Sequence, residues 1–499
     1  MGAQNGSSLN SNNQNIKSNL SKITFDGLFN ENYFKIDSKE TNLLLNLELS
    51  HSRTKNPFNN KKDYFLGLMI KSKYDGEEIN ESIDISIALD ISNSMNKPIS
   101  SNLYNDNNTR IELAKECLSK LVLNLKREDK FSLLIFNENI ENIFKLSSKN
   151  DLINNLKLIK EIKSKGNCNL IKGLEGSINN LKDSKNKNKR IILITDLQNE
   201  KKNDKLISLY KKCTNELNIP ITIISITNSN NKLAHKLSLE KGCNYFTIER
   251  KEDLENYLIK SFKYICYPIA YNFYLEFESS NMVIEKCIGS GFDLLIKNED
   301  AAPILNNNNI NEKYFCKISS CFPSQLNIKN QDLFQKGGII LLKVKPKENI
   351  NCDKYDININ LVYSDRNEEK YFQNYQFKFN KEDFREDEFS NKSIENAVSL
   401  FYFGFIMNKF LNKKKKNNHY CTVKNKESIE NFLKVHYNQV QLDDNDLKRE
   451  YLKQLNDIKE ITELKNNYII INNINIKEKK ILQESNGNKE EAPSIIQNK

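Results

Sequence analysis

The sequence predicts an α/β domain with a doubly wound, mostly parallel sheet, inserted into an antiparallel β-sandwich and followed by a helical C-terminal region. Two observations carry this prediction. Strand-like and helix-like segments alternate from residue 81 to residue 262, which is the pattern of a parallel sheet covered by helices on both faces. On either side of that stretch, apolar residues recur with a period of two, as in antiparallel strands.

The length of 499 residues predicts two to four domains, and a hydrophobic fraction of 38% is enough to build their cores. Both ends of the chain are polar and are expected to be disordered. The predicted order is a disordered tail (1–20), sandwich strands (21–80), the α/β domain (81–262), further sandwich strands (263–388), a helical region (389–470) and a second disordered tail (471–499).

Charge and cysteine content limit the classes of function. The net charge of +10 is spread over 75 basic and 65 acidic residues and no nucleic-acid reading module accompanies it, so we expect no nucleic-acid partner. Ten cysteines without framework spacing, and no signal peptide, favour a reducing cytoplasm. No Cys/His spacing predicts a zinc site.

The N-terminus offers two interpretations. Met1-Gly2-Ala3-Gln4-Asn5-Gly6-Ser7 nearly matches the N-myristoylation pattern, with the expected serine displaced by one position to Ser7. The alternative is an ordinary flexible terminus. One myristoyl chain binds membranes only marginally, so acylation at Gly2 would make the protein peripheral at a membrane only with a second contact.

The following elements are assigned in chain order. Strands are predicted before the α/β domain at Leu43–Leu49 and Tyr64–Ile70, and within it at Ile83–Leu89, Lys130–Phe136, Ile140–Leu146 (an antiparallel edge), Ile191–Asp196, Ile219–Ile226 and Asn244–Ile248. Apolar residues at helical spacing predict helices that begin at Ile111, Leu152, Leu170, Leu206 and Asp253. A further helix is predicted between the last two of these strands. Later strands are predicted at Tyr271–Phe277, Phe292–Ile296, Gly338–Val344, Ile357–Tyr363 and Tyr371–Phe379, and helices at Ser393–Leu411 and Asp446–Leu464. No apolar run is long enough to span a membrane.

The first strand of the α/β domain ends in a polar motif. Asp90-x-Ser92-x-Ser94 places one carboxylate and two hydroxyls at alternate positions, where the carboxyl edge of a parallel sheet presents its loops. These are hard oxygen donors, which suit Mg²⁺ or Ca²⁺ (or Mn²⁺) rather than zinc or iron. Taken alone, the motif also fits a helix cap or a turn.

This motif resembles the metal-ion-dependent adhesion site of von Willebrand factor A domains. The family's second loop, Gly-x-Thr-Asn, corresponds to Gly166-Asn167-Cys168-Asn169, and its later Thr-Asp-Gly corresponds to Thr195-Asp196-Leu197. Cys168 replaces the threonine and Leu197 replaces the glycine. A thiol is a poorer ligand for Mg²⁺ than a hydroxyl, so the departure at Cys168 bears on the metal site.

The resemblance implies a binding module whose metal is completed by an Asp or Glu of a partner protein. It implies Asp90, Ser92 and Ser94 as direct ligands and Asp196 as a direct or water-mediated ligand. The order of strands, α/β domain, strands and helices is similar to intracellular proteins of plants and protists that contain this domain. Some of these carry a RING ubiquitin-ligase module, for which this chain lacks the Cys/His spacing.

The sequence leaves two other functions open. A hydrolase would use a metal at Asp90, but a phosphatase of the haloacid dehalogenase type needs a second aspartate where Ser92 stands. A membrane scaffold would depend on Gly2 acylation, basic patches and a degenerate metal site. We expect a cytoplasmic, Mg²⁺-dependent protein-interaction protein without catalysis.

Overall fold

The structure is a computed structural model that describes residues 29, 32–36, 42–57, 59, 61–99, 109–197, 204–226, 232–248, 254–289, 313–329, 332–347, 354–380 and 388–411. The chain divides into two compact units. One comprises Thr24–Thr54 and Asp63–Ala397, and the other comprises Met1–Ile23, Lys55–Lys62 and Val398–Lys499. Both predicted tails, Gly2 and the predicted helix Asp446–Leu464 lie outside the described residues.

A six-stranded sheet forms the α/β domain, with strand order β6-β5-β4-β7-β8-β9. All neighbours are parallel except the edge strand β6, which pairs antiparallel with β5, as the sequence predicted. The central strand β4 is buried at every position, which explains its continuous apolar run. The strands are β4 (Asp84–Asp90), β5 (Lys130–Phe136), β6 (Ile140–Ser148), β7 (Lys189–Thr195), β8 (Ile221–Ser225) and β9 (Asn244–Thr247).

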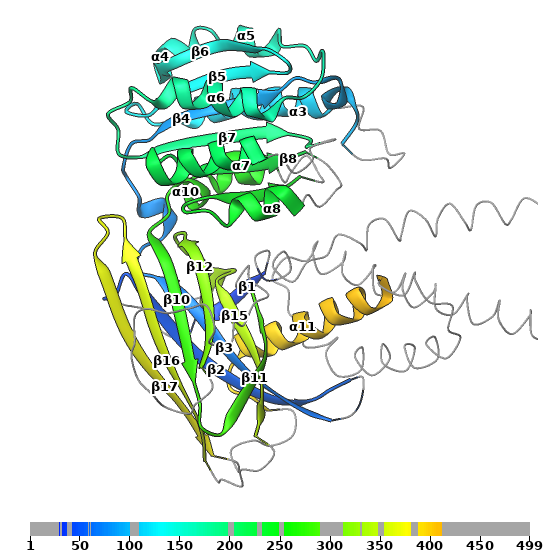
Figure 1. Cartoon of the computed structure of the whole chain (residues 1–499), viewed down its shortest axis with the longest axis vertical. Helices are drawn as coiled ribbons and strands as arrows, with labels where there is room; N and C mark the ends of the chain where they lie inside the picture. The colour runs from blue at the N-terminus through cyan, green and yellow to red at the C-terminus, as the bar shows by residue number, and fades with distance from the viewer. Residues whose placement is uncertain are drawn as a thin grey trace, which may run out of the picture. The chain divides into compact units, whose positions relative to one another are not determined.

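Helices cover both faces of this sheet, and α6, α7 and α8 lie over one of them (Figure 1). Successive side chains of a strand point to opposite faces, so Ile87 and Leu89 join one core cluster and Ala88 joins the other. The first cluster contains α3 (Arg110–Asn124), α4 (Lys149–Ile153), α5 (Lys157–Lys160), η4 (Asn256–Lys260) and α10 (Phe262–Cys266). The second contains α6 (Leu170–Leu181), α7 (Asp204–Lys211), η3 (Lys212–Glu216) and α8 (Lys232–Ser238).

The segment Leu152–Ile162 differs from the prediction. One helix was expected there, and the structure has the two short helices α4 and α5 with a turn at residues 154–156. Asn154 and Asn155 occupy that turn, and the Asn155 side-chain amide donates to the Asp151 carbonyl. Asparagine side chains compete for backbone groups in this way, so the turn is favoured over a continuous helix.

The sandwich is built from two antiparallel sheets, with strand orders β12-β10-β16-β17 and β11-β15-β3-β2-β18. Their inner faces form one core cluster, which includes Leu68 of β3, Phe273 of β10 and Leu342 of β15. The strands are β2 (Leu45–Lys55), β3 (Lys62–Ser72), β10 (Ala270–Glu278), β11 (Met282–Ile288), β12 (Lys313–Cys321), β15 (Ile339–Pro346), β16 (Lys354–Asp365), β17 (Lys370–Asn380) and β18 (Glu388–Phe389).

Strands from both sides of the α/β domain meet in one sheet, which confirms the predicted insertion. β3 precedes the domain and β15 follows it, and the two pair antiparallel with Tyr64 opposite Val344. Where the inserted chain leaves the sandwich, a 3-10 turn, η1 (Gly76–Glu78), is capped by Asp75. The Tyr264 hydroxyl donates to Asp75, and Lys263 forms an ion pair with Glu77 (2.8 Å), so the two ends of the insertion are fastened together.

A third small sheet was not predicted. It has the strand order β1-β14-β13, with β1 (Tyr33–Ile36), β13 (Gln325–Lys329) and β14 (Asp332–Lys336). The structure also contains β11 and β12 where the sequence pattern predicts loops. The strand predicted at Phe292–Ile296 lies outside the described residues.

The predicted helix at Ser393–Leu411 is α11 (Lys392–Leu411). Its Ile394 lies against β3, because a Cβ added to Gly67 would come within 2.7 Å of the Ile394 Cδ1 atom. In the described part of the chain, no helix is both long and apolar enough to cross a membrane.

Candidate functional site

Asp90 lies at the end of β4 and is fully buried. Its Oδ1 accepts the Ser92 backbone N–H (2.8 Å), and its Oδ2 accepts the Thr195 hydroxyl (2.6 Å). Burial raises the pKa of the Asp90 carboxyl above its usual value, while hydrogen bonds from Thr195, Ser92 and Cys168 act in the opposite direction. The carboxylate is therefore oriented, but removal from water leaves its charge poorly compensated.

Ser92 and Ser94 present their hydroxyls side by side in the loop after β4. Their Oγ atoms are 3.1 Å apart, with Ser92 buried and Ser94 half-buried. The loop is fixed by a 3-10 turn, η2 (Asn93–Asn96), and by the buried side chain of Met95. The two hydroxyls and the Asp90 carboxylate thus belong to one compact, rigid turn.

The second predicted loop is tied to the first by its backbone. Lys165 N–H donates to the Ile91 carbonyl (2.6 Å), and Asn93 N–H donates to the Gly166 carbonyl (2.9 Å). Gly166 has a φ of +75°, and an added Cβ would lie 2.3 Å from the Glu138 carboxylate, so this loop needs glycine there. The Cys168 thiol hydrogen-bonds to Asp90, which places it beside the first loop.

Asp196 follows β7 and is fully buried. Its Oδ2 accepts from Arg110 Nη1 at 2.6 Å, and these side chains are 0% and 9% exposed respectively. Arg110 is the first residue of α3, after the N-cap Thr109, and its backbone N–H donates to the Lys97 carbonyl (3.0 Å). The start of α3 is therefore held next to the Ser92–Ser94 loop.

The structure brings Asp90, Ser92, Ser94 and Cys168 together, and it places Asp196 after the adjacent strand β7. Two further residues were missed. Thr195 holds Asp90 in place, and its position before Asp196 in the Thr-Asp pair was the available signal. Arg110 pairs with Asp196, and its only sequence signal is its place at the start of the helix that follows the serine loop.

These residues fit a hard divalent cation in their donor type. Carboxylate and hydroxyl oxygens come from Asp90, Ser92, Ser94 and Asp196, and Cys168 is the one soft donor. Within the described ranges, no cluster of three or more histidine, cysteine, aspartate or glutamate side chains could hold a metal ion. A metal here would therefore depend on the serine hydroxyls as much as on the two carboxylates.

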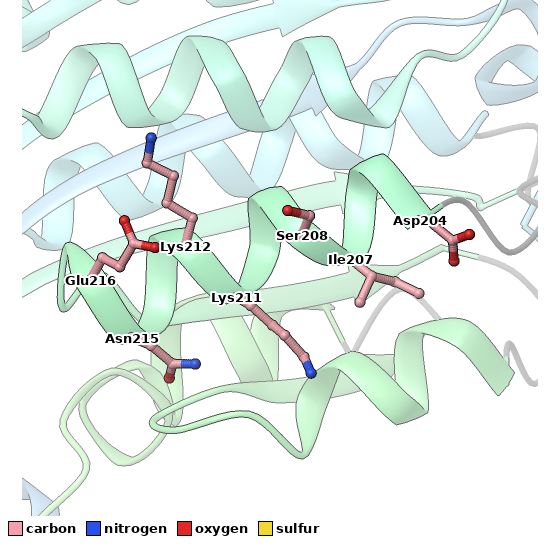
Figure 2. A pocket seen from close by; sticks show the side chains of 7 residues that line it. All are labelled: Asp204, Ile207, Ser208, Lys211, Lys212, Asn215 and Glu216. Atoms are coloured by element: carbon pink, nitrogen blue, oxygen red, sulfur yellow. The ribbon is translucent and has the colours of Figure 1, made fainter.

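A shallow hollow of about 490 Å³ lies elsewhere on the α/β domain (Figure 2). All its lining residues belong to α7 and η3, and none comes from the three loops. Figure 2 shows the Lys211 and Lys212 side chains pointing away from each other along this helix. The hollow is therefore separate from the candidate site.

The fold and the three loops define a von Willebrand factor A domain. The family model for the von Willebrand factor type A domain matches residues 84–259, so this part of the chain is such a domain. Domains of this family generally mediate protein–protein interactions, often through a divalent metal ion. A comparison with curated protein sequences gave no match.

Several solved structures are similar to the chain. The von Willebrand factor type A protein from Catenulispora acidiphila has 11% identity and a TM-score of 0.47, with 82% of this chain and 90% of that chain covered. The ArnB paralog VWA2 from Sulfolobus acidocaldarius has 14% identity and a TM-score of 0.42, with 84% and 98% covered. The conserved hypothetical protein BatB from Bacteroides thetaiotaomicron has 23% identity and a TM-score of 0.25, with 29% and 66% covered.

Proposed function

We propose that this protein is a non-catalytic interaction module that binds an acidic side chain of a partner protein through Mg²⁺, or Ca²⁺ or Mn²⁺ in its place. The supporting observation is the convergence of Asp90, Ser92, Ser94 and Asp196 at the carboxyl ends of two adjacent strands, β4 and β7. When bound, the cation would supply a Lewis-acidic coordination position for a carboxylate of the partner.

The chemistry of these loops favours binding over catalysis. Hydrolysis needs a nucleophile with a base beside it, and the Ser92 hydroxyl has the Ser94 hydroxyl as its neighbour. No histidine occurs in any of the three loops. We therefore propose that the protein is not an enzyme.

A cytoplasmic location is part of the proposal. Free cysteines in the described part of the chain are consistent with a reducing compartment, and most of them are buried. Burial raises the pKa of Cys213 to about 12 and that of Cys243 to about 11, which keeps both thiols protonated and unreactive.

The test compares partner capture by the full-length wild type with capture by two matched variants. Asp90→Asn changes the carboxylate at the carboxyl end of β4, and Asp84→Asn changes another buried carboxylate at the amino end of the same strand. We expect proteins recovered from lysate in Mg²⁺ by the wild type and by Asp84→Asn to be lost in chelator and with Asp90→Asn. Identical partners under all these conditions would remove the metal from the function.

The rival function is a membrane scaffold anchored by acylation at Gly2, with a degenerate metal site. The observation that favours it is the Arg110–Asp196 ion pair, which compensates one site carboxylate without a metal. It predicts sedimentation of the protein with lipid vesicles that Gly2→Ala abolishes. Unchanged sedimentation of Gly2→Ala would reject this rival.

A further inference from the structure

Two buried carboxylates at the site require a compensating positive charge. Asp90 is the last residue of β4, and Asp196 comes directly after the adjacent parallel strand β7. Both residues are fully buried. An ionised carboxylate in such surroundings is costly unless a cation or several hydrogen-bond donors face it. Asp90 accepts hydrogen bonds from uncharged donors, namely the Thr195 hydroxyl and the Ser92 backbone N–H. Asp196 faces a full positive charge.

That charge is the guanidinium of Arg110, whose Nη1 lies 2.6 Å from Asp196 Oδ2. At this distance the guanidinium donates a charge-assisted hydrogen bond to the Asp196 carboxylate. It therefore gives Asp196 the electrostatic compensation that a divalent cation would give. Because both cations use the same carboxylate, each makes the binding of the other less favourable.

The ion pair is built from a single hydrogen bond rather than a two-pronged one. Among the described residues, the buried Nε atom of Arg110 has no hydrogen-bond partner. Two parallel bonds to one carboxylate would give a stronger and more rigid pair. Within the described part of the chain, Arg110 makes one hydrogen bond to Asp196 and leaves its buried Nε without a partner. Moving its side chain away from Asp196 therefore breaks one hydrogen bond, whereas a two-pronged pair would lose two.

The backbone at Arg110 is held in place by hydrogen bonds that do not involve its side chain. The Arg110 N–H donates to Lys97, and the Thr109 side chain caps α3 by accepting the Glu112 N–H (3.3 Å). Arg110 is the first helical residue, and its side chain is largely buried, with 9% of its surface exposed. A rotation about its side-chain bonds can therefore free Asp196 without unwinding α3.

We propose that Arg110 is an internal cation of this site that competes with the divalent metal for Asp196. In the metal-free protein the guanidinium compensates Asp196, and metal loading requires it to turn away from Oδ2. This inference rests on the metal-binding half of the function proposed above. It makes Arg110 a determinant of metal affinity, so the concentration of metal at which the site fills depends on the strength of one ion pair.

The test is a calorimetric titration of the full-length protein with Mn²⁺ alone. We expect Arg110→Gln to bind Mn²⁺ about tenfold more tightly than the wild type, which corresponds to about 1.4 kcal/mol. The matched control is Arg127→Gln, which removes the same charge from an exposed residue just after the other end of α3. We expect its Mn²⁺ affinity to equal that of the wild type.

A second measurement separates competition from damage to the fold. Arg110→Gln leaves Asp196 without this cation, so in chelator its Tm should be lower than that of the wild type. Saturating Mn²⁺ should raise the Tm of Arg110→Gln by more than it raises that of the wild type. If Arg110→Gln does not fold, Arg110→Lys keeps the charge with a shorter reach, and its affinity should lie above that of the wild type.

Equal or weaker Mn²⁺ binding by the folded Arg110 variant would overturn the inference, and this includes the case in which neither protein binds. Such a result is distinct from failure of the proposed function, because the titration contains no partner. The proposed function fails on the capture experiment, where wild type and Asp90→Asn would recover the same proteins.

Discussion

Leu197 combines an unfavourable backbone conformation with a well-buried side chain. Its φ is 48°, in the left-handed region, and its side chain is 6% exposed in the core formed by α6 and α7. The left-handed conformation costs a residue with a Cβ about 1 kcal/mol. Removing a buried leucine side chain costs about 2–4 kcal/mol. Burial therefore outweighs strain, which explains how leucine stands at the family's glycine position.

Replacing Leu197 by glycine and by alanine separates these two effects. Both variants lose the buried side chain, but only glycine relieves the strain. We expect Leu197→Gly to lower the free energy of unfolding by about 1–3 kcal/mol, from the difference of the two terms. Leu197→Ala should be less stable than Leu197→Gly by about 1 kcal/mol, because alanine retains the left-handed penalty.

The assay is urea unfolding of the full-length variants in chelator, followed by circular dichroism. A matched control is the same pair at Leu174, which is fully buried inside α6. There the order should reverse, because glycine costs about 1 kcal/mol more than alanine within a helix. If Leu197→Ala proves as stable as Leu197→Gly, no backbone strain is stored at Leu197 and the reasoning is wrong.

Three further predictions concern the site and its support. Burial raises the pKa of the Asp90 carboxyl above the usual value of 3.8. Asp90→Asn should therefore stabilise the metal-free protein at pH 7, and this gain should vanish as the pH falls through the raised pKa to below 3.8. Urea unfolding at both pH values checks this. Cys168→Thr should raise Mn²⁺ affinity in the calorimetric titration because a hydroxyl is a harder donor than a thiol, and an unchanged affinity would mean that position 168 does not touch the ion. Arg190 is fully buried and lies over the Phe322 ring, and its side chain donates to Cys266 O, Thr222 Oγ1 and Gly242 O. Arg190→Lys should lower the free energy of unfolding in urea by about 2–4 kcal/mol, because an ammonium cannot reach all three acceptors. A loss of less than about 1 kcal/mol would contradict this role.

The sequence predicted the α/β domain well because its inner strands β4, β5, β7 and β8 are buried on both faces and therefore largely apolar. The polar motif after Ile83–Leu89 then had to lie at the edge of the sheet, which placed Asp90, Ser92 and Ser94 correctly. The strands β12 and β13 were missed because their sequences contain lysine, serine and glutamine, which weaken the apolar alternation. Whether such a segment forms a strand depends on its pairing with neighbouring strands, and the pattern of a single sequence does not show that pairing.

The contacts that control charge at the site were not predictable from local sequence. The Arg110–Asp196 pair joins a helix start to a strand end 86 positions away, and the position of Arg110 at the start of the helix after the serine loop does not indicate which residue it pairs with. The conformation of Leu197 was equally hidden, because leucine normally indicates a right-handed or extended backbone. Both features arise from tertiary packing around the ends of β4 and β7.

The insertion also determines the order in which the chain can fold during synthesis. One edge of β3 (Lys62–Ser72) pairs with β15 (Ile339–Pro346). That edge stays unpaired until the ribosome has made the whole intervening α/β domain. That domain is continuous in sequence and can complete its own sheet beforehand, since domains fold as units as they emerge. Until then the unpaired edge of β3 is open to aggregation and to chaperones.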